Sequence, residues 1–273
     1  MSNLRIYGVR EQTVSETAAE RAYELLRLQG FCVLDSGLSP LEIEDLRAAF
    51  DSAREAYADR YGQDFDLAAL GEANILRVLP AIAPQFLKLV EAPLLQAVLH
   101  LAFGGSVTLN QVNGLINPPS PDAPPLRWHR DLPYQHYVAS RPLALNALFC
   151  LDDFTVENGA TQVAPGTHKE EKCPSEAVLL QIATPAPAPA GSFLVLDSML
   201  FHTGGENLTD SPRRGVNHVF TIPPFRQQIS LESALAGQTS VPPHLQRLLG
   251  FSSTEPRSVE EWLESRRARL GAN

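Results

Sequence analysis

The chain is poor in cysteine and has no long apolar run, and each shortage excludes a class of protein. Its three cysteines, Cys32, Cys150 and Cys173, are odd in number and lack the spacing of a metal site. We therefore expect reduced thiols in a cytoplasmic protein and no disulfide framework. No segment is long and apolar enough to cross a bilayer, and the stretch from Met1 to Arg5 has no apolar signal-peptide core. We expect neither a membrane anchor nor a secretory signal.

Positive charge is also scarce. Lysine and arginine number 22 against 31 aspartates and glutamates, which gives a formal net charge of -9. Nucleic acids and anionic membranes are bound by clustered Lys and Arg, so we expect neither partner and favour a small molecule. A chain of 273 residues can bury a full core as one large domain or two small ones. It contains no internal repeat.

Residues 15–103 are expected to form a mostly helical N-terminal part. The sequence Ser39-Pro40-Leu41-Glu42 combines a capping box with proline at the first helical position, which predicts the start of a helix. Apolar residues then recur every three or four positions and predict one buried face. They are Ile43, Leu46, Phe50, Ala53 and Tyr57. Gly30 is expected to end an earlier helix, with a short strand after it.

From about residue 105 to 225 the pattern changes to short apolar runs broken by proline and glycine. Strands of this length and spacing are typical of a sandwich or jelly roll. The clearest are predicted at 108–117, 143–151, 192–196 and 215–222. The Pro/Ala run 184–190 is expected to be a surface connection between strands. Residues 226–273 are expected to form a helical tail.

Two short segments carry candidate metal ligands. Trp128-His129-Arg130-Asp131 lies near the middle of the chain, and Phe201-His202-Thr203-Gly204-Gly205 follows about seventy residues later. Side chains alternate along a strand, so His129 and Asp131 point to one side and Arg130 to the other. Two imidazoles and one carboxylate make up the facial triad that holds non-haem Fe(II) and leaves positions open for a cosubstrate and O₂. The other interpretation of His129 is a solvated loop histidine.

Arg213 stands eleven residues after His202. A guanidinium offers two parallel N–H donors to a carboxylate, so Arg213 suits a cosubstrate that carries one. If its side chain points inward, those of Gly215 and Asn217 share that face. Arg214 is then expected on the solvent side.

With these motifs the chain resembles the phytanoyl-CoA dioxygenase family of Fe(II)- and 2-oxoglutarate-dependent oxygenases, over roughly residues 20–225. Two further stretches are similar to the family. They are 111–119, which ends in Pro118-Pro119, and 151–168, with Leu151-Asp152-Asp153, Glu157-Asn158-Gly159 and Pro165-Gly166-Thr167-His168. The resemblance implies a mainly β protein with flanking α-helices, a double-stranded β-helix (jelly roll, cupin-like) core and a single dioxygenase domain over 1–273. The chain departs from the family at Asn117, where the family often has lysine.

The resemblance also implies roles for the motif residues. His129, Asp131 and His202 would hold Fe(II), and Arg213 would bind the 5-carboxylate of 2-oxoglutarate. With O₂, such a site hydroxylates its substrate and releases succinate and CO₂. Relatives that chlorinate lack the carboxylate ligand, so Asp131 indicates oxygenation.

Five more residues are candidates for ligand contact. Gln111 matches a family position near 2-oxoglutarate, and Thr161 is a second candidate for the cosubstrate. Asn113, Asn217 and His136 are candidates for the substrate. The alternative for the amides is hydrogen bonding to neighbouring backbone, and for His136 it is surface exposure.

The two segments expected at the mouth of the site, 60–80 and 132–141, carry Tyr, Gln, His and Arg. This composition indicates a small metabolite of polar or mixed polarity, with secondary metabolism as one setting. Nothing in the sequence marks a coenzyme A site. Two other classes stay open: a metal-dependent cupin-like isomerase or hydrolase, which would not need Arg213, and a non-catalytic relative that binds a ligand.

Overall fold

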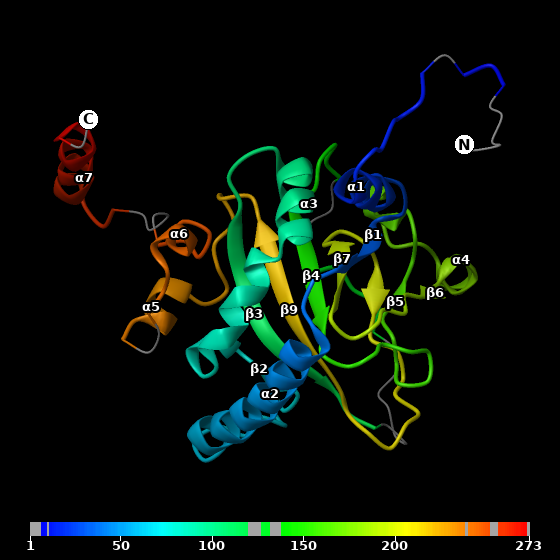
Figure 1. Cartoon of the computed structure of the whole chain (residues 1–273), viewed down its shortest axis with the longest axis horizontal. Helices are drawn as coiled ribbons and strands as arrows, with labels where there is room; N and C mark the ends of the chain where they lie inside the picture. The colour runs from blue at the N-terminus through cyan, green and yellow to red at the C-terminus, as the bar shows by residue number, and fades with distance from the viewer. Residues whose placement is uncertain are drawn as a thin grey trace.

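Two antiparallel β-sheets form the centre of the molecule (Figure 1). The structure is a computed structural model that describes residues 7–9, 11–119, 127–131, 138–237, 240–251 and 256–271. The larger sheet has six strands in the order β1-β7-β4-β9-β3-β2, and the smaller has three in the order β6-β5-β8. The strands are β1 Phe31–Asp35, β2 Ile75–Leu76, β3 Thr108–Asn117, β4 Ala144–Cys150, β5 Gln162–Val163, β6 Thr184–Pro185, β7 Ser192–Asp197, β8 His202–Thr203 and β9 Arg213–Thr221.

The N-terminal helices pack on one face of the six-stranded sheet. They are α1 Ala18–Gln29, α2 Pro40–Tyr61, η1 Leu79–Ala81, η2 Pro84–Glu91 and α3 Pro93–Phe103. Phe50 of α2 and Val98 of α3 share one buried core with Phe149 of β4 and Phe220 of β9. This apolar core joins the helices to the sheet, and the helices cover its outer face.

The predicted start of α2 and its apolar face are confirmed. Ser39 Oγ accepts a hydrogen bond from the Glu42 N–H at 3.3 Å, and the Glu42 carboxylate accepts one from the Ser39 N–H at 2.9 Å. Ile43, Leu46, Phe50 and Ala53 are buried, and Tyr57 packs partly buried against them. Gly30 ends α1 in the left-handed conformation, with φ of 89°, and β1 begins at the next residue.

The opposite face of the six-stranded sheet looks toward the smaller sheet. Leu148 of β4 and Leu194 of β7 pack there in a second core with Val163 of β5. Two facing antiparallel sheets with helices on the outside confirm the predicted jelly-roll architecture.

The prediction of a surface connection at 184–190 was wrong. Thr184–Pro185 forms β6 and pairs with β5, while Ala186 and Ala188 are buried in the second core. An extended chain sends alternate side chains to opposite faces. The alanines between the prolines therefore point into the second core, where their small side chains fit.

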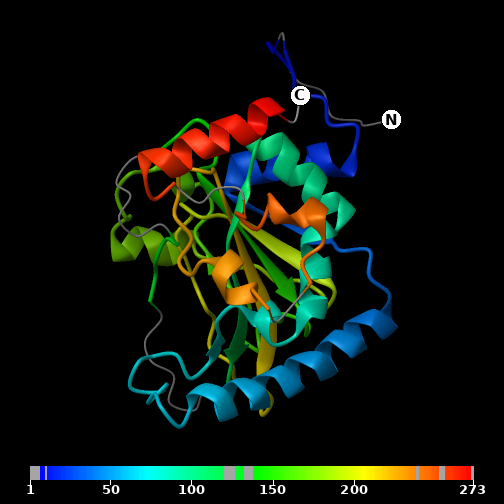
Figure 2. The same cartoon turned by 90° about the vertical axis from the view of Figure 1, so that its left-hand side faces the viewer.

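The remaining helices lie around this centre. The connection from β5 to β6 contains η3 Thr167–Lys169 and α4 Glu176–Ile182, and the tail contains α5 Leu231–Leu235, α6 Pro243–Gln246 and α7 Val259–Gly271. In Figure 2, α7 lies near the top of the molecule and α2 at the bottom.

No single helix among the described residues has the length and apolarity to span a membrane. The pair η2 and α3 meets both criteria only when the two are taken together, and they are bent by 60° against each other. Their apolar residues, such as Phe86 and Leu95, belong to the buried core.

Candidate active site

Three predicted ligands meet between the two sheets. His129 and His202 exchange two backbone hydrogen bonds, from the N–H of each to the carbonyl oxygen of the other, at 3.0 and 3.1 Å. The Nε2 atoms of His129 and His202 lie 3.7 and 3.4 Å from carboxylate oxygens of Asp131. The three candidate ligand atoms all lie within 4.8 Å of one another. The fold thus brings residues that are distant in the sequence to one point.

Both imidazoles have the tautomer that a metal needs. Nδ1 of His129 lies 2.8 Å from the carbonyl oxygen of Arg127, and Nδ1 of His202 lies 2.9 Å from that of Leu200. A carbonyl only accepts, so each Nδ1 carries the proton and each Nε2 keeps its lone pair for a metal. Burial lowers the pKa of His202, which keeps that ring neutral. The donor set fits a divalent ion such as Fe(II).

Arg130, which separates the two ligands in the sequence, is buried. Its guanidinium stacks over the ring of Phe201, with 4.1 Å from Cζ to the ring centroid. It also donates hydrogen bonds to the backbone carbonyl oxygens of Met199, Thr167, Glu170 and Glu171. Arg130 therefore ties the segment that carries His129 and Asp131 to the turn that leads into His202. The His-x-Asp pattern alone gave no sign of this role.

A cavity of about 340 Å³ opens beside the three ligands. Its walls come from β2, β3, β4, β7, β8 and β9 and from the segments next to them. They consist of Gly71, Asn74, Ile75, Leu115, Ile116, Asn117, His129, Asp131, Asn146, Leu148, Thr161, Leu196, His202, Gly204, Arg213 and Asn217. Arg213 is the sole lysine or arginine among these lining residues. The cavity is therefore amide-rich and apolar, with one fixed positive charge.

Arg213 begins β9 and reaches into this cavity. Its guanidinium stacks on the ring of Phe154, with 3.8 Å from Cζ to the centroid, and its Nε donates to the carbonyl oxygen of Asn158 at 3.3 Å. No carboxylate forms an ion pair with it in the described part of the chain. Burial lowers the pKa of Arg213 to about 10, so it stays charged near neutral pH. Stacking and the Nε bond fix its plane and leave the two terminal nitrogens for an anion.

Two glycines let the loops around Arg213 approach each other. Gly159, with φ of 79°, lies against Gly205, and a Cβ on either residue would clash with backbone of the other loop. Asn117 bridges the same loops, because its amide donates to the carbonyl oxygens of Asn158 and Gly205 at 3.3 and 3.1 Å. At the position where the family often has lysine, this chain therefore has a neutral side chain that holds loop backbone.

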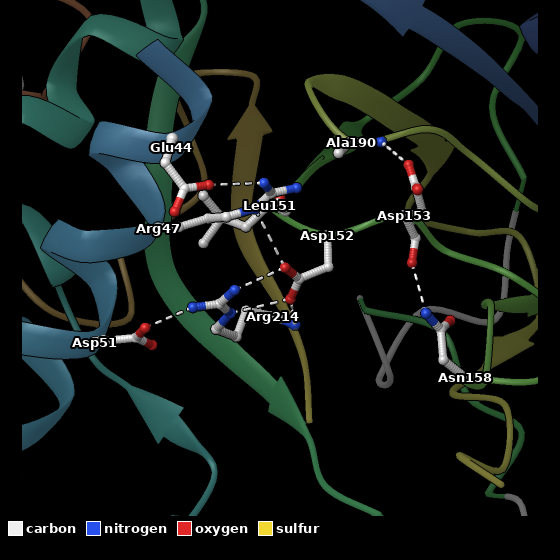
Figure 3. Close-up of polar contacts among 9 residues, drawn as sticks. All are labelled: Glu44, Arg47, Asp51, Leu151, Asp152, Asp153, Asn158, Ala190 and Arg214. Carbon is white, nitrogen blue, oxygen red and sulfur yellow. Dashed lines mark hydrogen bonds and ion pairs between the residues drawn. The ribbon is translucent and has the colours of Figure 1, made fainter. Parts of the chain in front are cut away.

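Arg214 meets different surroundings on the other face of β9 (Figure 3). Its guanidinium binds both oxygens of Asp152, at 3.0 and 2.8 Å, and one oxygen of Asp51 on α2, at 2.7 Å. Arg47 of α2 joins this network through Asp152 at 3.4 Å. These ion pairs raise the pKa of Arg214 and connect α2 to the start of β9. Arg213 and Arg214 point to opposite faces as predicted, but Arg214 faces α2 and its side chain is only 19% exposed, so its expected place on the solvent side was wrong.

The other candidates are divided between the cavity and its surroundings. Thr161 and Asn217 line the cavity, and Asn217 Oδ1 is buried without a hydrogen-bond partner in the described part of the chain. Gln111 and Asn113 are not among the lining residues. Asn113 instead accepts from the Val78 N–H and donates to Gln111, both at 3.1 Å.

A β-bulge between Leu109 and Gln111 interrupts the pairing of β3 with β9. The bulge precedes Gln111, so Gln111 and Asn113 keep the strand face of Leu115 and Asn117, which line the cavity, and Asn113 pairs with Asn217. His136 lies outside the described residues.

Comparisons with known proteins agree with this geometry. The family model for phytanoyl-CoA dioxygenase (PhyH) matches residues 26–215. An uncharacterised protein of Mycobacterium tuberculosis is 29% identical, over 94% of this chain and 95% of its own. The iron/alpha-ketoglutarate-dependent dioxygenase ausO of Aspergillus calidoustus is 25% identical, over 89% of this chain and 86% of its own.

Solved structures share the fold. EctD from S. alaskensis, determined with 2-oxoglutarate and 5-hydroxyectoine, has a TM-score of 0.62 at 20% identity, covering 81% of this chain and 82% of its own. The non-heme alpha-ketoglutarate-dependent carbocyclase SnoK from nogalamycin biosynthesis has a TM-score of 0.55 at 19% identity, covering 76% and 87%. The family model extends from α1 to β9 and includes every residue of the candidate metal site. The protein belongs to the phytanoyl-CoA dioxygenase family.

Proposed function

We propose that the protein is an Fe(II)- and 2-oxoglutarate-dependent oxygenase that hydroxylates a small molecule. His129, Asp131 and His202 hold the iron, and Arg213 binds the far carboxylate of 2-oxoglutarate. The observation that carries this proposal is a buried guanidinium that no carboxylate of the described residues pairs with, in the same cavity as three metal-ligand side chains. A buried unpaired charge is costly, so an anionic ligand is the partner that this site favours.

The two other functional classes fit less well. A metal-dependent isomerase or hydrolase would use the three ligands but would give Arg213 no role. A non-catalytic ligand-binding relative would not need two imidazoles whose Nδ1 atoms are tied to carbonyl oxygens. The tautomers and Arg213 together favour the oxygenase.

Each residue has a definite task in this reaction. When bound, iron with 2-oxoglutarate and O₂ supplies the chemistry that oxidises a C–H bond and releases succinate and CO₂. The Nδ1 hydrogen bonds of His129 and His202 keep both Nε2 atoms aimed at the metal position. We propose that Arg213 orients the cosubstrate and that Thr161, which lines the same cavity, contacts it.

The lining of the cavity suggests the class of substrate. With Arg213 engaged by the cosubstrate, the other described lining residues offer amides, a hydroxyl and aliphatic side chains, without a further Lys or Arg. We propose an uncharged substrate of mixed polarity, and neither an acyl-coenzyme A nor another phosphate-bearing molecule. The proposed polar contacts are His136 and Asn217 Oδ1, which has no hydrogen-bond partner among the described residues.

Location and organisation belong to the same proposal. Cys32, Cys150 and Cys173 are all free thiols, which suits a reducing cytoplasm. We take residues 1–273 as a single oxygenase domain, since the family match already spans the helical part and most of both sheets.

Anaerobic titration tests the proposal. Adding Fe(II) and then 2-oxoglutarate should produce a weak visible charge-transfer band, because the cosubstrate chelates the metal. The matched variant Arg213→Leu should need a much higher cosubstrate concentration for the same band. A protein that binds Fe(II) but shows no spectral response to 2-oxoglutarate would contradict the oxygenase. A screen of uncharged metabolites beside their carboxylated analogues, read as succinate formation, then identifies the substrate.

A further inference from the structure

Asn146 makes a contact that neither the family match nor the ligand pattern assigns. It lies in the middle of β4, paired with Leu196 of β7 on one side and Val219 of β9 on the other. It is 3% exposed and lines the cavity. Its Nδ2 donates a hydrogen bond to Oδ2 of Asp131. The Asn146 amide therefore contacts the Asp131 carboxylate from β4, an inner strand of the six-stranded sheet.

Ser198 completes a closed ring of hydrogen bonds around that ligand. Its Oγ donates to Oδ1 of Asn146 at 3.0 Å, and its carbonyl oxygen accepts from the Asp131 N–H at 3.0 Å. The ring thus runs from the Asp131 backbone to Ser198, on to Asn146, and back to the Asp131 carboxylate. Ser198 is fully buried, so water does not compete for its hydroxyl.

This ring determines which way the Asn146 amide faces. The opposite orientation would place Oδ1 against the Asp131 carboxylate, and two acceptors repel each other. The Ser198 hydroxyl can donate or accept, and with the amide set by the carboxylate it donates to Oδ1. The hydrogen bond from Nδ2 fixes the rotation of the Asp131 carboxylate, with Oδ1 3.7 Å from His129 Nε2 and Oδ2 3.4 Å from His202 Nε2.

We propose that Asn146 is the positioning residue of the metal site, held in turn by Ser198. This inference rests on the proposed function, since it concerns the iron ligand. The ring fixes the Asp131 side chain when the protein folds, so metal binding does not have to order it. Iron held by His129, His202 and one oxygen of Asp131 would have further coordination positions for a chelating cosubstrate and O₂.

A different role for Asn146 would be direct contact with the substrate, because it also lines the cavity. The two roles differ in what they change. Substrate contact would alter the substrate KM and leave metal affinity unchanged. A positioning role lowers metal affinity before any substrate is added.

The test is titration of the metal-free protein with Co(II), an air-stable stand-in for Fe(II), followed by calorimetry and by the visible d–d spectrum. We expect Asn146→Ala to bind Co(II) roughly 10–100-fold more weakly than wild type, the range found when a partner of a metal ligand is lost. Its d–d spectrum should change because the carboxylate can rotate. Ser198→Ala, which removes one oxygen, should weaken binding by a smaller factor.

Asn110→Ala is the matched control. Asn110 is also buried, at 6% exposure, and lies on β3 of the same sheet, but its amide donates to the carbonyl oxygen of Arg226. Its loss should leave Co(II) affinity unchanged. Thermal unfolding of each variant shows that it is folded at the titration temperature.

Wild-type Co(II) affinity and spectrum in folded Asn146→Ala would overturn the inference. If that variant fails to fold, Ser198→Ala decides, and unchanged affinity there overturns it. Wild-type protein that takes up no metal would instead refute the proposed function, so the two failures are distinguishable.

Discussion

Arg213 and Arg214 are neighbours in the sequence, yet their guanidinium groups lie on opposite faces of β9 in opposite surroundings. Arg213 stacks on Phe154 inside the cavity, without a carboxylate partner in the described chain. Arg214 binds Asp152 and Asp51 on the other face (Figure 3). The alternation of a strand thus separates one charge kept for a ligand from one that joins structural elements.

This pair gives a matched comparison of cosubstrate binding. Arg213→Leu should raise the KM for 2-oxoglutarate at least about tenfold, because a hydrogen bond to a charged group contributes roughly 1.5–3 kcal/mol. Arg214→Leu should leave that KM unchanged and lower the free energy of unfolding by about 1–2 kcal/mol, since its ion pairs are partly exposed. Steady-state kinetics and urea denaturation of both variants measure the two effects. Equal changes in KM would refute the assigned faces of β9.

The long strands were predictable because each buries a regular apolar pattern. β3 spans Thr108–Asn117 as predicted, and β4, β7 and β9 lie within two residues of prediction. The smaller sheet was not predicted, since β5, β6 and β8 have two residues each. Two residues show no periodicity, and their pairing depends on distant segments.

Site residues could be predicted where they lie close together in the sequence at a characteristic spacing. His129 and Asp131 are two positions apart on one extended segment, and such a pattern can be recognised without a structure. Asn146 and Arg130 were missed because their partners come from other parts of the fold, and cross-strand contacts depend on register. The resemblance puts Gln111 beside the cosubstrate, yet in the structure its side-chain oxygen accepts a hydrogen bond from the Asn113 amide.

The ligand set predicts a second group of variants. His129→Ala, Asp131→Ala and His202→Ala should each lose Fe(II) binding and turnover while the fold survives, because three protein ligands are all that hold the ion. Iron titration by calorimetry measures affinity, and circular dichroism reports the fold. His244→Ala is the control, since His244 is an exposed histidine that pairs with Glu91. Unchanged iron affinity in any one ligand variant would remove that residue from the site.

His218 should make stability depend on pH. The ring is fully buried between Phe193 and Phe220, and burial lowers its pKa from the ordinary value of 6.5 to about 4. Between these pH values the unfolded chain binds the proton and the folded chain does not. The free energy of unfolding contributed by His218 should therefore fall by about 1.4 kcal/mol for each pH unit as pH drops through this window.

The comparison must be made between variants, because Asp197 acts in the opposite direction. Burial raises the pKa of Asp197 to about 6, so the folded chain binds the extra proton there and gains stability as pH falls. Urea denaturation of wild type and His218→Leu at several pH values isolates the histidine. The stability of wild type relative to His218→Leu should decline from pH 6 to pH 4. The stability of wild type relative to Asp197→Asn should instead rise over the same range. A difference that is flat with pH would show that His218 is not held neutral.

The last prediction concerns the reaction outcome. In the proposed site, Asp131 supplies a charged ligand two residues from His129, and its carboxylate accepts a hydrogen bond from Asn146. Chloride could enter that coordination position only by displacing a carboxylate that is hydrogen-bonded to the Asn146 amide. We therefore expect hydroxylation, or another oxidation such as desaturation, and no chlorinated product from the wild type. Asp131→Gly should be inactive and should not become a halogenase, because removing the carboxylate also leaves the Asn146 amide without its acceptor. Mass spectrometry of the product formed in excess chloride measures this directly, once a substrate is known. A chlorinated product from the unmodified protein would mean that Asp131 does not ligate iron.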